Sequence, residues 1–353
     1  MSAARERPKD ERRARFTLPE VTEVIARFEV GPIRRAREYP AGSRRAPKLL
    51  LETGSGRYLL KRRMLSRHPL PRIRFAHAVQ RTLERCGFPV AGLVPTSGNA
   101  DSLVIREGHV YELFRFVEGT RFDRTGESCG RAGESAAWLH RHLAGHATDG
   151  LEPASFHRSP TVGLALRSTV DSVSAADPAA DRAEIAALVR NVSIAYAEAA
   201  GRVEDAGFPG APLHTVHGDF HPGNLLFSEG RVVAVLDFDS VRHEPRIVDI
   251  ANGMMQFAQL GQRGVSPLDW PSRLDPARCT AFLAGYGRAT DVPVSAAERT
   301  MIPPLMIEAL IAESVIPIAN TGTFADLPAG PFLATVVRKC EWIRENAEAI
   351  SAA

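Results

Sequence analysis

A short polar segment interrupts the largely helical pattern of the chain's second half, and it reads His217-Gly218-Asp219-Phe220-His221-Pro222-Gly223-Asn224. Two strand-like runs joined by a turn follow it, which predicts a hairpin over residues 225–236. Because a hairpin returns the chain to its starting point, Asp237 should lie beside Asn224. Gly218 and Gly223 permit the tight turns that this path requires. The segment therefore restricts the chain to folds that bring these side chains together.

The spacing of Asp219, Asn224 and Asp237 matches that of groups used in phosphoryl transfer. In such sites an Asp accepts the proton of the attacking hydroxyl, an Asn five residues later binds metal, and a further Asp after a hairpin completes the metal site. A triphosphate carries several negative charges, which Mg²⁺ ions neutralise through hard oxygen ligands. The pattern predicts that Asp219 positions an acceptor hydroxyl, whereas Asn224 and Asp237 bind Mg²⁺.

The motif His-Gly-Asp-x-x-x-x-Asn, followed by Asp-Phe-Asp at 237–239, resembles the signature of the aminoglycoside phosphotransferase and choline kinase-like family, distant relatives of the protein kinases. The resemblance covers residues 28–325. It implies an α+β, bilobal protein kinase-like fold with a small antiparallel-sheet N-lobe and a larger, mainly helical C-lobe. It also implies ATP or GTP as phosphate donor, Mg²⁺ as cofactor, and a small hydroxyl-bearing acceptor such as an aminoglycoside, amino alcohol or sugar.

The resemblance assigns supporting roles to four residues around the motif. His217 is expected to act as a scaffold within the catalytic loop, and Asp249 to brace that loop from the next helix. Asp239 is expected to support a metal through water or to fix the loop. His221 is expected to orient the loop or to touch substrate, with an ordinary hydrogen-bonding histidine as the alternative interpretation.

Short strand-like runs separated by turn signals dominate the first third of the chain, at 33–38, 48–52, 58–62, 102–106 and 109–116. Between them, residues 73–83 place apolar side chains three and four positions apart, which predicts one amphipathic helix. Helical patterns follow after Gly119, at 136–143, 183–206 and 301–318. We therefore expect a flexible tail, a nucleotide-binding lobe, and a catalytic and substrate-binding helical lobe at 1–20, 21–117 and 118–353.

Lys61 resembles the strand lysine of this family, which contacts the α- and β-phosphates of the nucleotide. The adjoining Arg62 and Arg63 are interpreted as surface cations, and alternation along a strand turns Arg62 to the other face. The family usually holds the lysine with a Glu from the lobe's helix, and this sequence departs from that pattern. Three residues of the predicted helix remain candidates for the role: His77, Gln80 and Glu84.

Two further segments of this lobe match nucleotide contacts in the family. Gly42 and Ser43 occupy the turn that covers the phosphates, although a full Gly-x-Gly-x-x-Gly is absent. Backbone groups near Glu112, Leu113 and Phe114 match the hinge that hydrogen-bonds the purine edge. An inner strand is the ordinary interpretation of the same segment, and both can hold together.

The acceptor is expected to be small, because the dozen residues from Asp237 to Asp249 leave no room for the long activation loop of protein kinases. Glu308 and Glu313 interrupt the apolar run at 301–318 and are candidates for substrate binding, with an exposed or capping carboxylate as the alternative for Glu313. A protein-directed kinase, a nucleotide-binding pseudokinase and a metal-dependent hydrolase are the alternatives at the level of function.

Composition narrows the choice of partners. With 44 basic and 41 acidic side chains the formal net charge is +3, which does not call for a nucleic-acid partner. The sequence suggests no membrane-spanning run of about 18 apolar residues. The four cysteines lie far apart, which is typical of reduced thiols in a cytoplasmic protein. The oligomeric state and the identity of the acceptor stay open.

Overall fold

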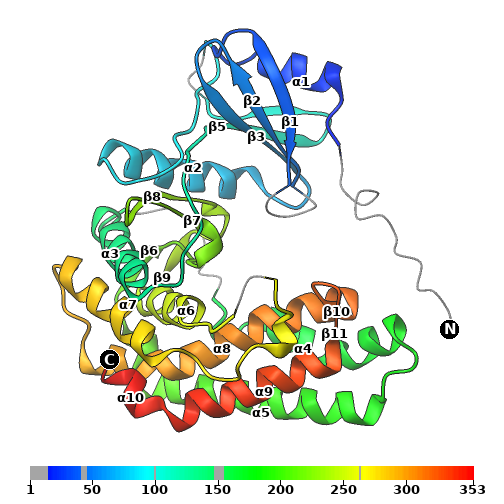
Figure 1. Cartoon of the computed structure of the whole chain (residues 1–353), viewed down its shortest axis with the longest axis vertical. Helices are drawn as coiled ribbons and strands as arrows, with labels where there is room; N and C mark the ends of the chain where they lie inside the picture. Colours follow the sequence, from blue (N-terminus) through cyan, green and yellow to red (C-terminus); the bar gives the residue numbers. More distant parts are fainter. Residues whose placement is uncertain (1–14, 41–45, 99–100, 147–154, 262–263) are drawn as a thin grey trace. The chain divides into compact units, whose positions relative to one another are not determined.

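The computed structural model describes residues 15–40, 46–98, 101–146, 155–261 and 264–353. The chain forms two compact units, Met1–Glu118 and Gly119–Ala353 (Figure 1). A five-stranded antiparallel sheet organises the first unit, whereas helices dominate the second. The predicted α+β, protein kinase-like fold class is confirmed.

The sheet of the first unit has the strand order β1-β2-β3-β5-β4. Its strands are β1 (Ile33–Tyr39), β2 (Lys48–Thr53), β3 (Arg57–Met64), β4 (Val104–Arg106) and β5 (His109–Arg115). Every run predicted as a strand in this region forms one, with ends that differ by one or two residues. The helix predicted over 73–83 is longer than expected and spans α2 (Leu70–Arg85).

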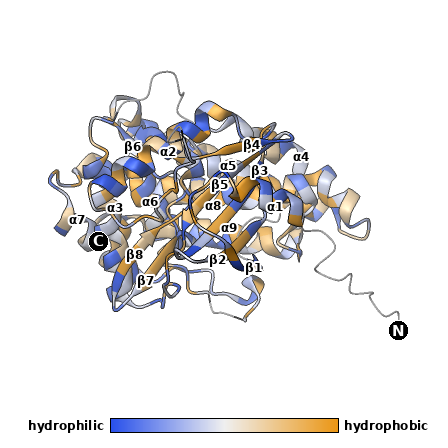
Figure 2. Cartoon of the chain, turned by 90° about the horizontal axis from the view of Figure 1, so that it is seen from above, coloured by the Kyte–Doolittle hydropathy of each residue, from blue (hydrophilic) through white to orange (hydrophobic). Residues whose placement is uncertain are grey.

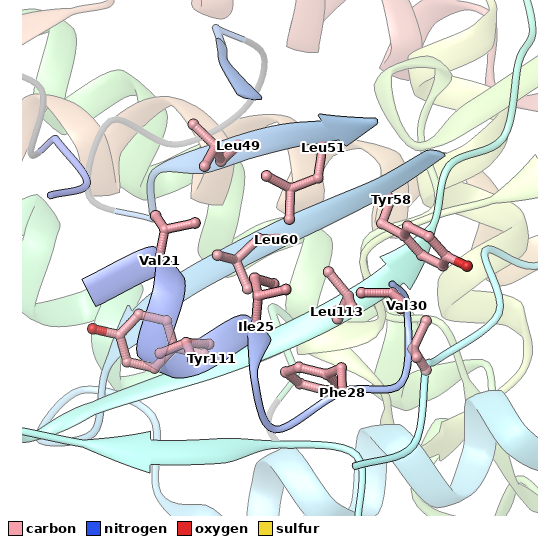
Figure 3. Packing of buried hydrophobic residues seen from close by; sticks show 12 residues of the cluster. Val21, Ile25, Phe28, Val30, Leu49, Leu51, Tyr58, Leu60, Tyr111 and Leu113 are labelled. Carbon is pink, nitrogen blue, oxygen red and sulfur yellow. The ribbon is translucent and has the colours of Figure 1, made fainter. Parts of the chain in front are cut away.

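One helix packs against each face of this sheet. Figure 3 shows Leu49, Leu51 and Leu60 packing beside Val21 and Ile25 of α1 (Leu18–Ile25). The opposite face carries a smaller apolar cluster in which Ile73 of α2 contacts Val110 and Leu103. Strand β3 combines the apolar Leu59 and Leu60 with the hydrophilic Lys61, Arg62 and Arg63, and Figure 2 colours each residue by its hydropathy. Alternation along β3 thus places Leu60 toward α1 and Lys61 on the other face.

The flexible tail predicted for 1–20 extends too far, because α1 already begins at Leu18. Thr17 and Glu20 form a capping box, in which the Glu20 amide donates to Thr17 Oγ1 at 3.4 Å and the Thr17 amide donates to Glu20 Oε2 at 3.0 Å. Glu20 is buried and accepts hydrogen bonds from Arg62 at 2.6 Å and from the Tyr111 hydroxyl at 2.7 Å. The sequence pattern Thr-x-x-Glu was the signal for this helix.

The second unit consists mainly of helices, and its long ones are α3 (Gly126–His142), α4 (Pro160–Ala176), α5 (Arg182–Asp205), α6 (Ile247–Phe257), α7 (Pro276–Ala289), α8 (Ala296–Thr321) and α9 (Ala329–Glu345), followed by the short α10 (Ala347–Ser351). Among the described residues of this unit, three two-stranded sheets accompany the helices: β6 (Leu213–Val216) with β9 (Arg242–Pro245), β7 (Leu225–Ser228) with β8 (Arg231–Val235), and β10 (Thr323–Phe324) with β11 (Leu327–Pro328). The predicted hairpin over 225–236 is the pair β7–β8. The described part of this unit also contains four single-turn 3₁₀ helices: Phe208–Gly210, Pro222–Asn224, Phe238–Ser240 and Pro267–Asp269.

Helix α8 is long and apolar enough to cross a membrane by length and composition, contrary to what the sequence suggested. Of its most apolar 18-residue window, 83% is buried inside the protein. That burial is what a core helix of a globular unit shows, because its neighbours α4, α5, α6 and α9 cover it on several sides.

Helices α3 and α7 approach each other so closely that glycine is required at their contact. A Cβ added at Gly133 would lie 2.0 Å from the carbonyl oxygen of Phe282, and one at Gly285 would lie 2.0 Å from the carbonyl oxygen of Gly130. Both contacts involve backbone atoms, so no rotation of a side chain relieves them. The α3–α7 pair therefore forms a rigid contact in the helical unit.

We predict that Gly133→Ala lowers the free energy of unfolding by about 1–3 kcal/mol, because the added methyl group forces α3 and α7 apart. Gly201→Ala in α5 is the control, since no atom lies within 4 Å of its added Cβ, and it should stabilise by about 0.5–1 kcal/mol through helix propensity. Urea denaturation of both variants measures the difference. Equal stabilities for the two variants would contradict the close contact.

Candidate active site

A buried carboxylate beneath the polar segment holds its backbone in place. Asp249, in the first turn of α6, accepts hydrogen bonds from the amides of His217 at 2.6 Å and Gly218 at 2.8 Å. His140 of α3 contacts the same carboxylate with Nε2 at 3.2 Å and meets the Tyr286 hydroxyl with Nδ1 at 2.9 Å. Burial opposes the charge on Asp249, but the hydrogen bond from His140 and the loop amides hold its pKa below the ordinary 3.8. The negatively charged carboxylate of Asp249 therefore holds the first two residues of the polar segment in place.

Gly218 occupies a position that only glycine fits. Its φ is +75°, and an added Cβ would lie 2.1 Å from Arg242 Nη1 and 2.3 Å from the Ser240 carbonyl oxygen. The buried Arg242 donates to the carbonyl oxygens of Gly218 at 3.0 Å and Ser240 at 3.1 Å, while Glu244 neutralises it at 2.7 Å. The arginine thus joins the polar segment to the turn after β8.

Hydrogen bonds connect Asn224 to Asp219 and to Leu236, the residue before Asp237. The Asn224 side-chain Nδ2 donates to the backbone oxygen of Asp219 at 2.9 Å and to its Oδ2 at 3.1 Å. The backbone oxygen of Asn224 accepts from the amide of Leu236 at 2.8 Å, so the β7–β8 hairpin returns the chain to its start. Asp237 is the next residue after Leu236. The structure brings Asp219, Asn224 and Asp237 together.

Asp237 has a left-handed backbone, with φ 63° and ψ 70°. This conformation costs a residue other than glycine about 1–2 kcal/mol, and such strain is retained mainly at functional positions. The neighbouring residues fix the turn: the carbonyl oxygen of Leu236 lies 3.0 Å from His217 Nε2, and the ring of Phe238 packs 4.9 Å from the His217 ring. His217 is fully buried and therefore serves as a scaffold. Asp239 lies half-buried within the same turn.

The chemistry of these side chains fits a hard divalent cation. Both hydrogen bonds of the Asn224 amide nitrogen go to Asp219, which leaves its Oδ1 to act as a ligand beside the Asp237 carboxylate. Mg²⁺ binds proteins through one or two such oxygens and takes its other ligands from phosphates and water. Within the described residues no group of three or more His, Cys, Asp or Glu side chains is gathered as a metal site. Asn224 and Asp237 therefore suit a metal that arrives with a triphosphate.

His221 lies beside Asp219 and favours its charged form. The Nε2 atom of His221 is 3.6 Å from Asp219 Oδ2, while its Nδ1 accepts from the Gly223 amide at 3.0 Å. Burial opposes the charge on Asp219, but the hydrogen bond and charge of His221 lower its pKa below the ordinary value. Burial likewise opposes the charge on His221, whereas Asp219 raises its pKa. Asp219 is thus a carboxylate at neutral pH.

Sequence reasoning missed Arg121, which lies close to the loop. Its Nη1 donates to the carbonyl oxygen of Gly223 at 2.7 Å, and the rest of the side chain is exposed. The residue follows Gly119-Thr120, and Thr120 pairs with Phe227 of β7 in an isolated bridge. No local motif marks it, because the contact depends on that long-range pairing.

The structure separates the two glutamates proposed for substrate binding. Glu313 is exposed on α8 and accepts a hydrogen bond from Gln256 of α6. Desolvation by the surrounding protein, and then the negative charge of Asp219, raise its pKa above the ordinary 4.5. Glu308 was predicted wrongly. It is fully buried, and its oxygens accept from His157 Nδ1 at 2.8 Å and from the Arg158 amide at 3.2 Å.

In the first unit, the carboxylate opposite Lys61 comes from a strand and not from the helix. Lys61 is buried on β3 and pairs in register with Glu112 on β5. Glu112 lies 2.5 Å from His77 Nε2 of α2 and accepts from Arg63 Nε at 2.6 Å. Burial opposes the charge on Glu112, but His77, Arg63 and Lys61 together lower its pKa. Of the three helix candidates, His77 thus contacts Glu112, the β5 residue opposite Lys61 in the register of the sheet.

The other two helix candidates for holding Lys61 have different surroundings. Gln80 donates to the carbonyl oxygen of Ala91 at 2.5 Å. Glu84 lies so close to Gly92 that a Cβ added there would come 2.4 Å from Glu84 Oε1. Both side chains therefore lie beside the segment that follows α2.

The interpretation of Arg62 and Arg63 as surface cations is wrong. Arg62 is 9% exposed and Arg63 is 4% exposed. They point to opposite faces as alternation predicts: Arg62 pairs with Glu20 beneath α1, whereas Arg63 pairs with Glu112 beside α2. Each arginine is buried because a carboxylate neutralises it.

A second lysine lies on the same face as Lys61. Lys48 of β2 is directly opposite Lys61 in the register of the sheet, and cross-strand partners share a face. Like charges placed opposite each other destabilise a sheet, and an anion that binds both ammonium groups removes that cost. Gly42 and Ser43, predicted beside this face, lie outside the described residues.

The predicted hinge residues belong to β5. The carbonyl oxygen of Leu113 accepts from the Val94 amide at 2.8 Å. Glu112 and Phe114 pair in register with Lys61 and Leu59 of β3. The ordinary interpretation as an inner strand is therefore correct, whereas the contact with a purine stays a prediction.

We predict that Asp249→Asn lowers the free energy of unfolding by about 3 kcal/mol at pH 7, because the two loop amides donate to different carboxylate oxygens, whereas asparagine has one acceptor oxygen and no negative charge for His140 to meet. A carboxylate with a lowered pKa stabilises the fold above its unfolded pKa and loses that effect as the pH falls through its folded value. The difference between wild type and variant should therefore be constant above about pH 5 and shrink below pH 3.8. Urea denaturation across this range measures it.

Asp291→Asn serves as the control, because that carboxylate is 69% exposed, and it should change stability by less than about 0.5 kcal/mol. A pH-independent difference for Asp249→Asn would contradict a charged brace.

Comparisons with known proteins concern the family and the fold of this chain. Residues 36–297 match the model of the phosphotransferase enzyme family. A glucosamine kinase from Streptacidiphilus jiangxiensis is 30% identical over 44% of this chain and 35% of its own length. A homoserine kinase from Phenylobacterium zucineum (strain HLK1) is 25% identical over 82% of this chain and 81% of its own length. The chain thus spans about a third of the first relative and four fifths of the second.

Among solved structures, an amicoumacin kinase in complex with AMP-PNP and Ca²⁺ shares the fold, with a TM-score of 0.67, 14% identity, and coverage of 94% of both chains. The family match extends from the first strand of the sheet, across both units, to the start of α8. It includes Lys61 and the whole segment from His217 to Asp249. This chain belongs to the phosphotransferase enzyme family.

Proposed function

We propose that this protein transfers the γ-phosphate of ATP or GTP to a hydroxyl group of a small molecule, with Mg²⁺ as the cofactor. The observation that carries the proposal is the hydrogen bonding of Asn224. Its amide joins Asp219 to the hairpin that ends at Asp237, which gathers an ionised carboxylate and two metal-ligating oxygens in one place. Phosphoryl transfer needs this set of groups and little covalent help from the protein.

Each residue of this set has a distinct role in the proposed mechanism. Asn224 Oδ1 and the Asp237 carboxylate would hold Mg²⁺, which would neutralise charge on the triphosphate. Asp219 accepts a hydrogen bond from the acceptor hydroxyl, orients its oxygen toward the γ-phosphorus and takes up its proton as the new O–P bond forms. The bond to the leaving oxygen of the nucleoside diphosphate breaks in the same displacement. His221 favours the ionised form of Asp219, and Asp249 holds the backbone of the loop at His217 and Gly218 in place.

Lys61 and Lys48 are proposed to bind phosphate oxygens of the nucleotide. Two ammonium groups on adjacent strands provide a site for a polyanion, and each charge-assisted hydrogen bond contributes about 1.5–3 kcal/mol. Glu112 pairs with Arg63 and His77, and both lysines lie on the same face of the sheet as Glu112. The purine is proposed to lie near Glu112, Leu113 and Phe114, with Gly42 and Ser43 over the phosphates.

The acceptor is proposed to carry an amine as well as a hydroxyl. Glu313 is exposed, lies within electrostatic reach of Asp219, and is oriented by Gln256, so it offers a carboxylate for an ammonium group. Glucosamine and homoserine, for which the relatives are named, both contain a hydroxyl and an amine. The short segment between Asp237 and Asp249 favours such small acceptors over an extended peptide.

We predict that Asp219→Ala lowers the rate of acceptor-stimulated transfer by at least about 10³-fold and leaves nucleotide affinity within about threefold of wild type, because Asp219 contacts the acceptor and not the donor. Asp237→Ala should instead weaken Mg²⁺-dependent nucleotide binding by about 100-fold, since it removes a metal ligand. Nucleoside diphosphate release with an alcohol acceptor, together with titration of a fluorescent nucleotide, measures both effects. The exposed Asp291→Ala is the control. Wild-type turnover by the Asp219 variant would refute its role.

We also predict that Lys48→Met weakens nucleotide binding by about 10-fold without lowering the free energy of unfolding, because the substitution removes a phosphate contact and relieves the repulsion by Lys61. Arg85→Met, an exposed cation at the end of α2, is the control and should leave nucleotide affinity unchanged. Nucleotide titration and thermal melting measure the two effects. An unchanged dissociation constant for Lys48→Met would remove Lys48 from the proposed site.

A further inference from the structure

Arg121 lies outside the polar segment, yet its side chain contacts the turn that carries Asn224. Its Nη1 donates to the carbonyl oxygen of Gly223 at 2.7 Å, and Gly223 belongs to the 3₁₀ helix Pro222–Asn224. The arginine is exposed, so this contact adds little to the buried core. A charged donor makes a stronger hydrogen bond to a carbonyl oxygen than a neutral donor does. The main effect of the contact is therefore to fix the position of one peptide group.

The backbone from which the Arg121 side chain extends is itself held in place. Thr120 and Phe227 of β7 form an isolated bridge, in which the Thr120 amide donates at 2.7 Å and the Phe227 amide donates at 2.9 Å. Gly119 packs so closely against the β7–β8 hairpin that an added Cβ would lie 2.9 Å from Leu226 Cβ. The residues just before Arg121 are thus anchored on that hairpin, and the guanidinium group is directed from a fixed starting point.

The peptide group between Gly223 and Asn224 is held at both of its ends. Its oxygen accepts from Arg121, and its N–H donates to the carbonyl oxygen of His221 at 2.9 Å. The peptide group that follows Asn224 is held as well, because its oxygen accepts from the Leu236 amide at 2.8 Å. A peptide unit is planar, so fixing its oxygen and its N–H fixes its orientation. The contacts on both sides of Asn224 therefore determine the direction of its side chain.

Gly223 makes this turn depend on the groups around it. An added Cβ would lie 2.5 Å from Cε1 of the His221 ring, so the position has room for glycine alone while the ring keeps its place. The ring stays there because its Nδ1 accepts from the Gly223 amide at 3.0 Å. Glycine restricts its own backbone less than any other residue does. The direction of the Gly223 carbonyl is therefore set by its hydrogen bond from Arg121 and not by the residue itself.

We propose that Arg121 is a positioning residue, whose hydrogen bond to Gly223 directs Asn224 so that its Oδ1 faces the metal that accompanies the nucleotide. This inference rests on the proposed function and adds a residue to it. The Asn224 amide nitrogen is already committed to two oxygens of Asp219, so a rotated backbone would turn Oδ1 away or break those bonds. Groups that hold a metal ligand from behind commonly change metal affinity by about 10- to 100-fold.

The sign of the effect separates positioning from the charge of the arginine. A guanidinium group repels a nearby cation, so removing its charge alone would strengthen metal binding. If Arg121 instead positions Asn224, removing the side chain weakens metal binding, although the positive charge is lost at the same time. The melting temperature should stay unchanged, because water replaces the arginine at an exposed carbonyl oxygen.

The test measures the affinity for Mn²⁺ by electron paramagnetic resonance, in the presence of a non-hydrolysable nucleotide and without any acceptor. We expect Arg121→Met to weaken Mn²⁺ binding about 10- to 100-fold, because the Gly223 carbonyl is no longer held. Arg121→Lys should recover most of the affinity, since the contact uses a single N–H and the ammonium group supplies one. Arg190→Met, at an exposed position of α5, is the control and should bind Mn²⁺ as the wild type does.

A double-mutant cycle with Asn224→Ala shows whether Arg121 acts through Asn224. In that background Arg121→Met should cause no further loss of Mn²⁺ affinity. An equal loss in both backgrounds would overturn the inference, and so would unchanged or tighter Mn²⁺ binding by Arg121→Met alone. Both results would leave the proposed function intact, because the wild type still binds metal and nucleotide. A wild type that binds no Mn²⁺ with the nucleotide would overturn the proposed function and the inference with it.

Discussion

The two hydrogen bonds that Asp249 accepts from the loop backbone are the constraint on which the helical unit's site depends. They fix the start of the loop to the first turn of α6, where the helix dipole also favours a negative charge. His140 holds the carboxylate from α3, so two helices and the loop share one buried charge. Removing that charge would leave two backbone N–H groups without acceptors in the interior.

The rest of the loop is built outward from this anchor. Gly218 provides the left-handed turn that lets Arg242 reach the loop carbonyl, and Asn224 joins Asp219 to the returning hairpin. Asp237 is then held in a strained conformation that a free chain would avoid. Rigid positioning of this kind suits phosphoryl transfer, in which the protein orients groups and stabilises charge but forms no covalent bond itself.

Much of this architecture follows from the sequence, because the relevant contacts are local or have a fixed spacing. The strands of the first unit follow from alternation and turn residues, and the approach of Asp237 to Asn224 follows from a hairpin of predictable length. Pairings between distant segments were beyond such reasoning. The sequence did not indicate that Glu112 would lie opposite Lys61 or that Lys48 would share its face, because register depends on the whole sheet.

Burial was the other property that local patterns misjudged. Glu308 interrupts an apolar helix just as Glu313 does, yet one is enclosed by His157 and the other is exposed, and only the packing of neighbouring segments decides between them. Arg62 was interpreted as a surface cation, whereas Glu20 of α1, at the end of the segment predicted as a flexible tail, pairs with it. The partner of this strand residue thus lies on a helix that was not predicted.

The central claim is that Asn224 and Asp237 bind the metal that accompanies the nucleotide next to Asp219. A crystal structure with Mn²⁺ and a non-hydrolysable nucleotide, recorded at a wavelength where manganese scatters anomalously, tests it directly. The account predicts an anomalous peak about 2.1–2.3 Å from Asn224 Oδ1 and from an oxygen of Asp237, with a phosphate oxygen as a further ligand. A metal bound with its nucleotide elsewhere, and with neither residue as a ligand, would contradict it.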